Sequence, residues 1–191
     1  MKKETFSPRV NAYPMPVSIV GATVNGKPNF MTVAWFTKVN SNPPMMLISL
    51  GKKQYTVEGI RENKTFSINI AGNELVKEMD YCGLVSERVE DKSKLFTVFH
   101  GETETAPMIQ ECPINYELKL LETIELPGTY NYIGEIVAAY TNKKEISEKQ
   151  PDLPKINPII LIQSPTNHYH QLGQQIVEAF KVGRNLPSQK T

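Results

Sequence analysis

Two runs rich in β-forming residues, joined by Asn25-Gly26, constrain the fold of this 191-residue chain most strongly. The first run covers residues 17–24 and the second covers residues 29–39. An Asn-Gly pair favours the positive φ angles of a type I′ turn, whose twist matches that of two antiparallel strands. The segment is therefore predicted to be a β-hairpin.

Further strand and turn signals follow at short intervals. Asn42-Pro43-Pro44 ends the return strand, and Pro127-Gly128 separates two long alternating runs. Strands are predicted at residues 45–50, 65–71, 114–126, 130–140 and 158–163.

Helical patterns are fewer than strand patterns. They are predicted at residues 54–62, at 73–83 with Asn73 as the cap, and at 172–183 with a stripe of Leu172, Ile176, Ala179 and Phe180. A frayed tail is expected beyond Arg184. This order favours a mainly β fold with a few helices, closed into an antiparallel barrel, over a doubly wound parallel sheet that needs a helix between successive strands.

Composition and charge narrow the function classes. The net charge is +1, from 21 basic and 20 acidic residues, so no nucleic-acid or membrane-surface partner is predicted. The apolar run at 159–162 is too short to span a bilayer, and no signal peptide is predicted. Cys82 and Cys112 could form one disulfide, but nothing else indicates secretion, so free thiols are favoured. We expect one cytoplasmic domain over residues 1–191.

Several common site motifs are incomplete or absent. Residues 21–27 match the first seven positions of a P-loop, but Pro28 stands where the magnesium-binding hydroxyl belongs. No Gly-x-Gly-x-x-Gly or Gly-x-Ser-x-Gly occurs. His168 and His170 have no third ligand nearby in sequence, so no metal site is predicted.

The segment at 49–56 combines a strand end, a glycine loop and a helix start. Free N–H groups at a helix N-terminus favour phosphate, Lys52 and Lys53 add positive charge, and Ser49 and Thr56 add hydroxyl donors. The alternative is a solvated lysine loop with Thr56 in the first helical turn.

The strand just before this segment has apolar side chains on both faces. Phe30, Met31, Val33, Trp35 and Phe36 break the alternation of a half-buried strand. The neighbouring small residues would let a flat ligand approach the backbone. The alternative is that this strand is simply core.

Taken together, the order of these pieces resembles the flavin reductase-like FMN-binding split-barrel family, and within it the flavoredoxin-like branch. The resemblance covers about residues 8–183. The matching pieces are Tyr13-Pro14-Met15-Pro16-Val17, residues 29–35, Asn42-Pro43-Pro44, residues 49–56, Phe66-Ser67-Ile68-Asn69, Cys82-Gly83 with Ser86, Asp91-Lys92 and Gly134-Glu135-Ile136.

The resemblance implies a Greek-key split β-barrel, usually a homodimer, that holds FMN near the dimer interface. Residues 31–35 would line the isoalloxazine ring, residues 49–56 would hold the phosphate, and the segment at 82–86 would lie close to the flavin, with Arg88 and Lys92 near its anionic end. The cofactor-binding residues implied in this way are Asn29, Met31, Thr32, Val33, Ala34, Trp35, Ser49, Leu50, Gly51, Lys52, Tyr55, Thr56, Cys82, Gly83 and Ser86.

The implied function is an FMN-binding oxidoreductase that moves electrons through the flavin, with no catalytic side chain assigned. Many two-component flavin reductases carry Gly-x-His on a late strand, but residues 134–140 contain no histidine. This favours electron supply by a redox partner protein, with NAD(P)H as the other candidate donor. A non-catalytic FMN-binding module for flavin storage or sensing is the alternative. Cys82 is either a thiol near the flavin or a small buried residue that closes the helix.

Overall fold

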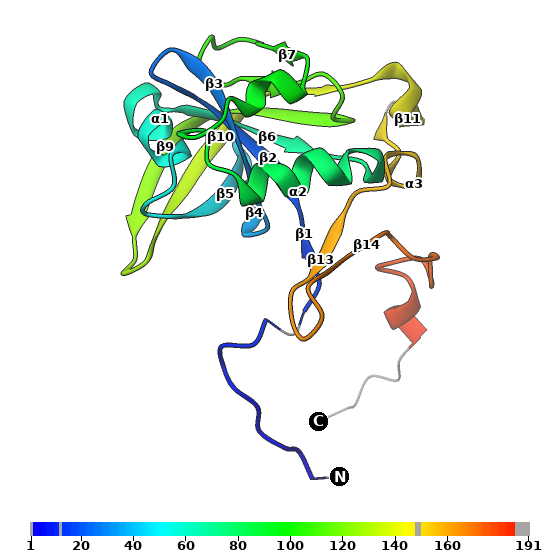
Figure 1. Cartoon of the computed structure of the whole chain (residues 1–191). Coiled ribbons are helices and arrows are strands. Elements are labelled where there is room, and N and C mark those ends of the chain that lie inside the picture. Colours follow the sequence, from blue (N-terminus) through cyan, green and yellow to red (C-terminus); the bar gives the residue numbers. More distant parts are fainter. Residues whose placement is uncertain (1, 12, 148–149, 186–191) are drawn as a thin grey trace.

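The computed structural model describes residues 2–11, 13–147 and 150–185, and its centre is one antiparallel sheet (Figure 1). Within this described part, seven strands lie in the order β3-β2-β6-β9-β10-β5-β4. Their bounds are β2 Ser18–Val24, β3 Lys27–Val33, β4 Phe36–Ser41, β5 Pro44–Gly51, β6 Thr65–Ile70, β9 Ile114–Glu125 and β10 Thr129–Thr141.

The Asn25-Gly26 hairpin is confirmed. Val24 pairs with Lys27, and the two turn residues have φ angles of 50° and 74°. Both angles are positive, as a type I′ turn requires. The long alternating runs are also confirmed, because β9 and β10 pair along most of their length.

The single return strand predicted at 29–39 is wrong, because the chain leaves the sheet at Ala34 and Trp35. β3 pairs with β2 at one edge of the sheet, whereas β4 pairs with β5 at the other. The Ser49 N–H donates to the Trp35 carbonyl at 2.9 Å, which continues the β4–β5 pairing by one residue before β4 begins. The interruption therefore lets consecutive segments form opposite edges of the sheet, as in the split barrel that the family resemblance implied.

Two helices cover the barrel. α1 (Thr56–Asn63) lies against β2, and a Cβ added at Gly59 would stand 2.3 Å from the Thr23 carbonyl oxygen. α2 (Val76–Leu84) crosses β3, where the Thr32 hydroxyl donates to the Met79 carbonyl. Asn73 does not cap α2 as predicted, because it begins the short 3-10 turn η1 (Asn73–Leu75) that precedes the helix.

The apolar core has two parts, one on each side of β2 and β3. One part fills the barrel and includes Val33, Leu50 and Phe66. The other lies under α2 and includes Phe30 and Met79. β3 thus contributes apolar side chains to both parts, which explains why its sequence lacks simple alternation.

The remaining short elements surround the barrel. They are β1 Met15–Pro16, η2 Lys92–Leu95, β7 Val98–Phe99, β8 Met108–Ile109, η3 Lys143–Glu145, β11 Ile146–Ser147, β12 Gln150–Pro151, α3 Leu153–Ile156, β13 Ile160–Ile162, β14 His168–His170 and η4 Val182–Asn185. None of the helices in the described residues is both long enough and apolar enough to cross a membrane.

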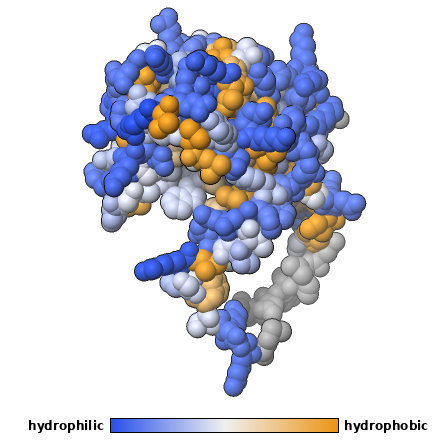
Figure 2. Space-filling model, in the orientation of Figure 1, coloured by the Kyte–Doolittle hydropathy of each residue, from blue (hydrophilic) through white to orange (hydrophobic). Residues whose placement is uncertain are grey.

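The segments at both ends extend away from the barrel (Figure 1), and apolar residues are visible on them as well as on the barrel (Figure 2). The helix predicted at 172–183 is wrong, because most of this stretch is irregular, with only η4 at its end. Ile176 is 97% exposed and Phe180 is 93% exposed. An apolar stripe stabilises a helix by packing, and these two side chains find almost no packing in the described part of the chain. The tail expected to fray includes residues 186–191, which lie outside the described residues.

Candidate functional site

A polar cavity of about 240 Å³ lies where β3, the start of α1 and the end of α2 meet. We call it the candidate cavity. Its lining comes from three separate parts of the sequence: Asn29 and Met31; Gln54, Tyr55 and Thr56; and Cys82, Gly83, Leu84, Val85, Ser86, Glu87 and Lys92. The chain thus brings together segments that the resemblance assigned independently to one ligand.

The N-terminus of α1 faces this cavity without a side-chain cap. The Val57 and Glu58 N–H groups donate to the carbonyls of Gln54 and Tyr55. The N–H groups of Tyr55 and Thr56 have no backbone acceptor in the described part of the chain. Free N–H groups and the helix dipole make this end of the cavity favourable for an anion.

Asn29 fixes the start of α1 to β3. Its side-chain N–H donates to the Thr56 hydroxyl at 2.8 Å, and both residues are buried. The hydroxyl hydrogen of Thr56 is therefore directed away from Asn29. The floor of the candidate cavity is held by a buried strand-to-helix hydrogen bond.

Lys92 fixes the opposite wall. Its ammonium donates to the carbonyls of Cys82 at 3.1 Å and Val85 at 2.8 Å, at the end of α2. Its backbone N–H donates to Glu87 Oε1 at 2.8 Å. Lys92 is only 3% exposed, so a buried cation neutralises the negative end of the α2 dipole.

Burial shifts the ionisation of three groups around this wall. Loss of solvent raises the pKa of the Cys82 thiol to about 11, although the Lys92 charge opposes the shift. Burial lowers the pKa of Lys92 and raises the pKa of Glu87. Glu87 Oε2 is buried and has no hydrogen-bond partner in the described residues. Cys82 is thus a neutral thiol at physiological pH.

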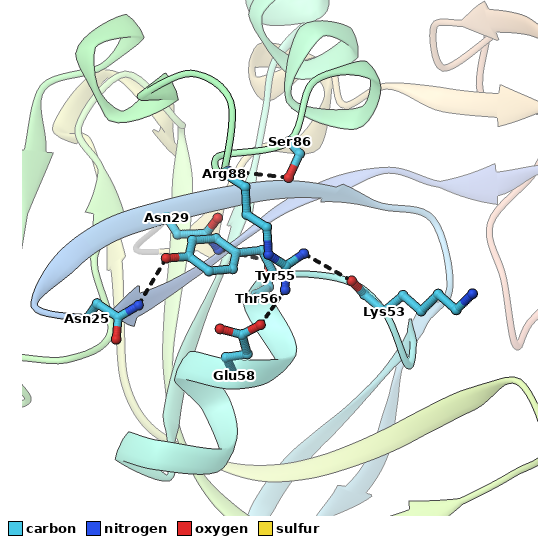
Figure 3. Close-up of polar contacts among 8 residues, drawn as sticks. All are labelled: Asn25, Asn29, Lys53, Tyr55, Thr56, Glu58, Ser86 and Arg88. Atoms are coloured by element: carbon cyan, nitrogen blue, oxygen red, sulfur yellow. Dashed lines mark hydrogen bonds and ion pairs between the residues drawn. The ribbon is translucent and has the colours of Figure 1, made fainter.

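Arg88 crosses from the loop after α2 to the start of α1 (Figure 3). Its guanidinium donates to the Lys53 carbonyl at 3.3 Å, pairs with Glu58 and lies 4.6 Å from the centre of the Tyr55 ring. The Asn25 side chain donates to the Tyr55 hydroxyl at 3.1 Å. Tyr55 is therefore held from both sides at the mouth of the cavity.

Part of the predicted set lies outside the candidate cavity. Val33 and Leu50 are core residues, and Thr32 faces α2. Ala34 and Trp35 line a separate apolar cavity of about 350 Å³, together with Tyr13, Pro14, Met15, Pro16, Phe36, Thr37 and Leu47.

The loop predicted to hold phosphate turns toward the β9–β10 hairpin. The Lys52 ammonium lies 2.5 Å from Glu125 Oε1 and 5.3 Å from the centre of the Tyr130 ring. Ser49 bonds to Trp35 through its backbone, and Gly51 accepts from the Gln54 N–H at 3.0 Å. These residues shape the approach to α1 rather than the cavity surface.

Sequence reasoning missed Gln54, Leu84, Val85 and Glu87 as lining residues. Each of the four adjoins a predicted residue in the sequence, so proximity alone could have found them. Glu87 lies in a polar stretch that follows the helix predicted at 73–83, and no pattern in the sequence marks its Oε2 atom as buried.

The chain matches the family described as "Flavin reductase like domain" over residues 10–170. Flavoredoxin from Methanosarcina acetivorans is 44% identical, with a TM-score of 0.93, over 96% of this chain and 98% of that chain. Flavoredoxin of Desulfovibrio vulgaris (Miyazaki F) is 34% identical, with a TM-score of 0.87, over 96% and 100%.

The chain is also similar in sequence to a reductase component and to an uncharacterized protein. The reductase component of a 4-nitrophenol 4-monooxygenase/4-nitrocatechol 2-monooxygenase from Rhodococcus opacus is 34% identical over 73% of this chain and 72% of that protein. An uncharacterized protein from Aeropyrum pernix is 29% identical over 68% of this chain, which spans only 50% of that protein. The family match covers most of the chain, and the two flavoredoxins share its fold almost end to end, so the chain belongs to the flavin reductase-like family.

Proposed function

We propose that this protein is an FMN-binding oxidoreductase that moves electrons through a flavin bound at the candidate cavity. One observation carries the proposal: three segments that the family resemblance assigned to FMN line a single cavity in a chain of that family. A flavin accepts and donates electrons, so the protein's task is to bind it, orient it and set its electrostatic surroundings.

The chemistry of the lining fits a flavin phosphate at the start of α1. The unpaired N–H groups of Tyr55 and Thr56 offer two backbone donors, and the Ser86 hydroxyl offers a third on the facing wall. The helix dipole adds partial positive charge. We propose that Ser49, Leu50, Gly51 and Lys52 act by shaping this helix start.

The remainder of the flavin needs more room than this cavity provides. About 240 Å³ is below the range of roughly 300–1,000 Å³ typical of ligand pockets. Met31, Cys82 and Gly83 give an apolar continuation, and the apolar cavity at Ala34 and Trp35 lies further along the same chain segment. We propose that β3 and the chain that follows it flank the ring, with Thr32 and Val33 supporting this wall from behind.

We propose a redox partner protein as the electron donor, with NAD(P)H as the alternative. Residues 134–140 in β10 lack the histidine that many two-component flavin reductases place there. Without that side chain, the nicotinamide loses one positioning contact.

Assembly and compartment are further proposals. A homodimer would cover the apolar side chains of the extended terminal segments, including Ile176 and Phe180, which are almost fully exposed in one chain.

Cys82 and Cys112 are free and buried, which suits the reducing cytoplasm. The family match over residues 10–170 supports one domain for the whole chain, residues 1–191.

The test is an FMN titration followed by anaerobic mixing with donors. The purified protein should take up FMN and become yellow. Slow or absent bleaching with NADH and NADPH, together with fast bleaching by a reduced electron-carrier protein, would support the partner-driven activity. Failure to take up FMN would refute the proposed function. Uptake without turnover under any donor would favour flavin storage instead.

A further inference from the structure

A second cavity of about 250 Å³ adjoins the candidate cavity, and we call it the outer cavity. The two cavities share Asn29, Tyr55 and Glu87 as lining residues. A ligand group that continued past the start of α1 in this direction would enter the outer cavity. The shared wall therefore governs how far a bound ligand can extend.

The Tyr55 ring forms part of this wall, and its contacts hold it in place. Its hydroxyl accepts from Asn25 at 3.1 Å, and the Arg88 guanidinium lies 4.6 Å from its ring centre (Figure 3). Arg88 is held in turn by Glu58 and the Lys53 carbonyl. Turning the ring aside would therefore break its contacts with Asn25 and with an Arg88 guanidinium that is itself fixed in place.

The charges of the outer cavity do not favour a second phosphate. Lys27 and Arg88 contribute positive charge, while Glu87 and Asp91 contribute two carboxylates. Arg88 is already paired with Glu58, and burial raises the pKa of Glu87, whereas Ser93 and Lys94 lower that of Asp91. With Arg88 engaged, the outer cavity offers little net attraction for an anion.

We propose that the Arg88–Tyr55 pair is the specificity determinant of the flavin site and restricts it to flavin mononucleotide. In flavin mononucleotide the phosphate is terminal, so the ligand would end at the start of α1. In flavin adenine dinucleotide, the second phosphate and the adenosine must pass Tyr55 into the outer cavity. This inference rests on the proposed function and deepens it by naming the ligand class and the residues that select it.

Arg88 can be removed without disturbing the core, because its side chain is 47% exposed. Arg61→Ala is a matched control, since Arg61 also stacks on a tyrosine, Tyr130, at 5.5 Å, but away from both cavities. Glu58→Gln is a second variant, which keeps the guanidinium and removes its charged partner. Thermal unfolding of each variant checks that it is folded.

The experiment measures the dissociation constants of FMN and FAD by quenching of flavin fluorescence. Wild type and Arg61→Ala should prefer FMN to FAD strongly and equally. Arg88→Ala should shift the ratio of the two constants toward FAD by about tenfold, and Glu58→Gln should shift it less in the same direction.

The possible failures are distinguishable. If wild type binds FMN but binds FAD equally well, or if Arg88→Ala leaves the ratio unchanged, the specificity proposal is overturned and the proposed function stands. If wild type binds neither flavin, both are overturned.

Discussion

Replacing Lys92 by methionine removes a buried charge while keeping the length of the side chain. The ammonium of Lys92 donates to the Cys82 and Val85 carbonyls at 3.1 and 2.8 Å. Hydrogen bonds to a charged group contribute about 1.5–3 kcal/mol each, so the two bonds represent roughly 3–6 kcal/mol. Removing the ammonium also removes the unfavourable free energy of its desolvation, which offsets part of this loss.

We therefore expect Lys92→Met to lower the free energy of unfolding by about 3 kcal/mol. For a chain of this size, that corresponds to a decrease of about 6–12 °C in the unfolding midpoint, measured by differential scanning calorimetry. The FMN dissociation constant should also rise, because the wall at residues 82–86 loses its anchor.

Lys94→Met is the matched control. The Lys94 side chain is 80% exposed, and its ammonium lies 3.6 Å from Asp91 at the surface. Its removal should change stability by no more than about 0.5 kcal/mol. If Lys92→Met unfolds within a degree or two of Lys94→Met and binds FMN equally well, the buried cation does not hold the site and the reasoning is wrong.

Two further predictions concern the helices beside the site. Gly59→Ala should lower the free energy of unfolding by about 1–3 kcal/mol in urea titrations, because the new Cβ would lie 2.3 Å from the Thr23 carbonyl oxygen and force α1 away from β2. Gly128→Ala is the control and should leave the free energy of unfolding unchanged, because no atom of the described residues lies within 4 Å of the added Cβ. A stable Gly59→Ala protein with unchanged FMN affinity would contradict this placement of α1. Alkylation of Cys82 should reach half its maximal rate near pH 11 in the native protein and near pH 9 in urea, because burial keeps the thiol protonated about two pH units higher. The folded state binds this proton more tightly, so its contribution to stability is complete below pH 9 and is lost as the pH rises to about 11. A native midpoint near 9, measured by mass spectrometry, would count against a buried neutral thiol.

The local pairing of strands could be predicted where the sequence alternates and the turn chemistry is explicit. Asn25-Gly26 and Pro127-Gly128 mark two hairpins, and β2, β9 and β10 follow from them. The break at Ala34 and Trp35 could not be predicted, because neither residue disrupts a strand. The break follows from closure of the barrel, a long-range effect that places β3 and β4 at opposite edges of the sheet.

The prediction of a terminal helix at 172–183 was wrong because the sequence pattern was present but, within the described residues, the packing surface was not. Leu172, Ile176 and Phe180 have helical spacing, but a periodic stripe specifies a helix only where a surface receives it. In one chain these side chains remain largely exposed. The periodicity indicates that a helix here would have one apolar face for packing. It does not show that the segment is helical without a surface to pack on.

The candidate site was predictable to the extent that its residues sit on motifs. Asn29, Thr56 and Gly83 come together as the resemblance implied. The positions of the half-buried Glu87 and the buried Lys92 depend on how the loop after α2 folds back under the helix end. The Lys92 ammonium holds that path through the Cys82 and Val85 carbonyls, and backbone carbonyls carry no side-chain signature in the sequence.

The central claim is that the candidate cavity binds FMN. The most direct measurement is an equilibrium titration of FMN against wild type and Ser86→Trp, whose indole would fill the cavity from its exposed rim. We predict one FMN per chain with a dissociation constant of about 1 μM or tighter for wild type, and binding at least about tenfold weaker for the variant at unchanged stability. No uptake by wild type, or equal affinity in the two proteins, would contradict the account.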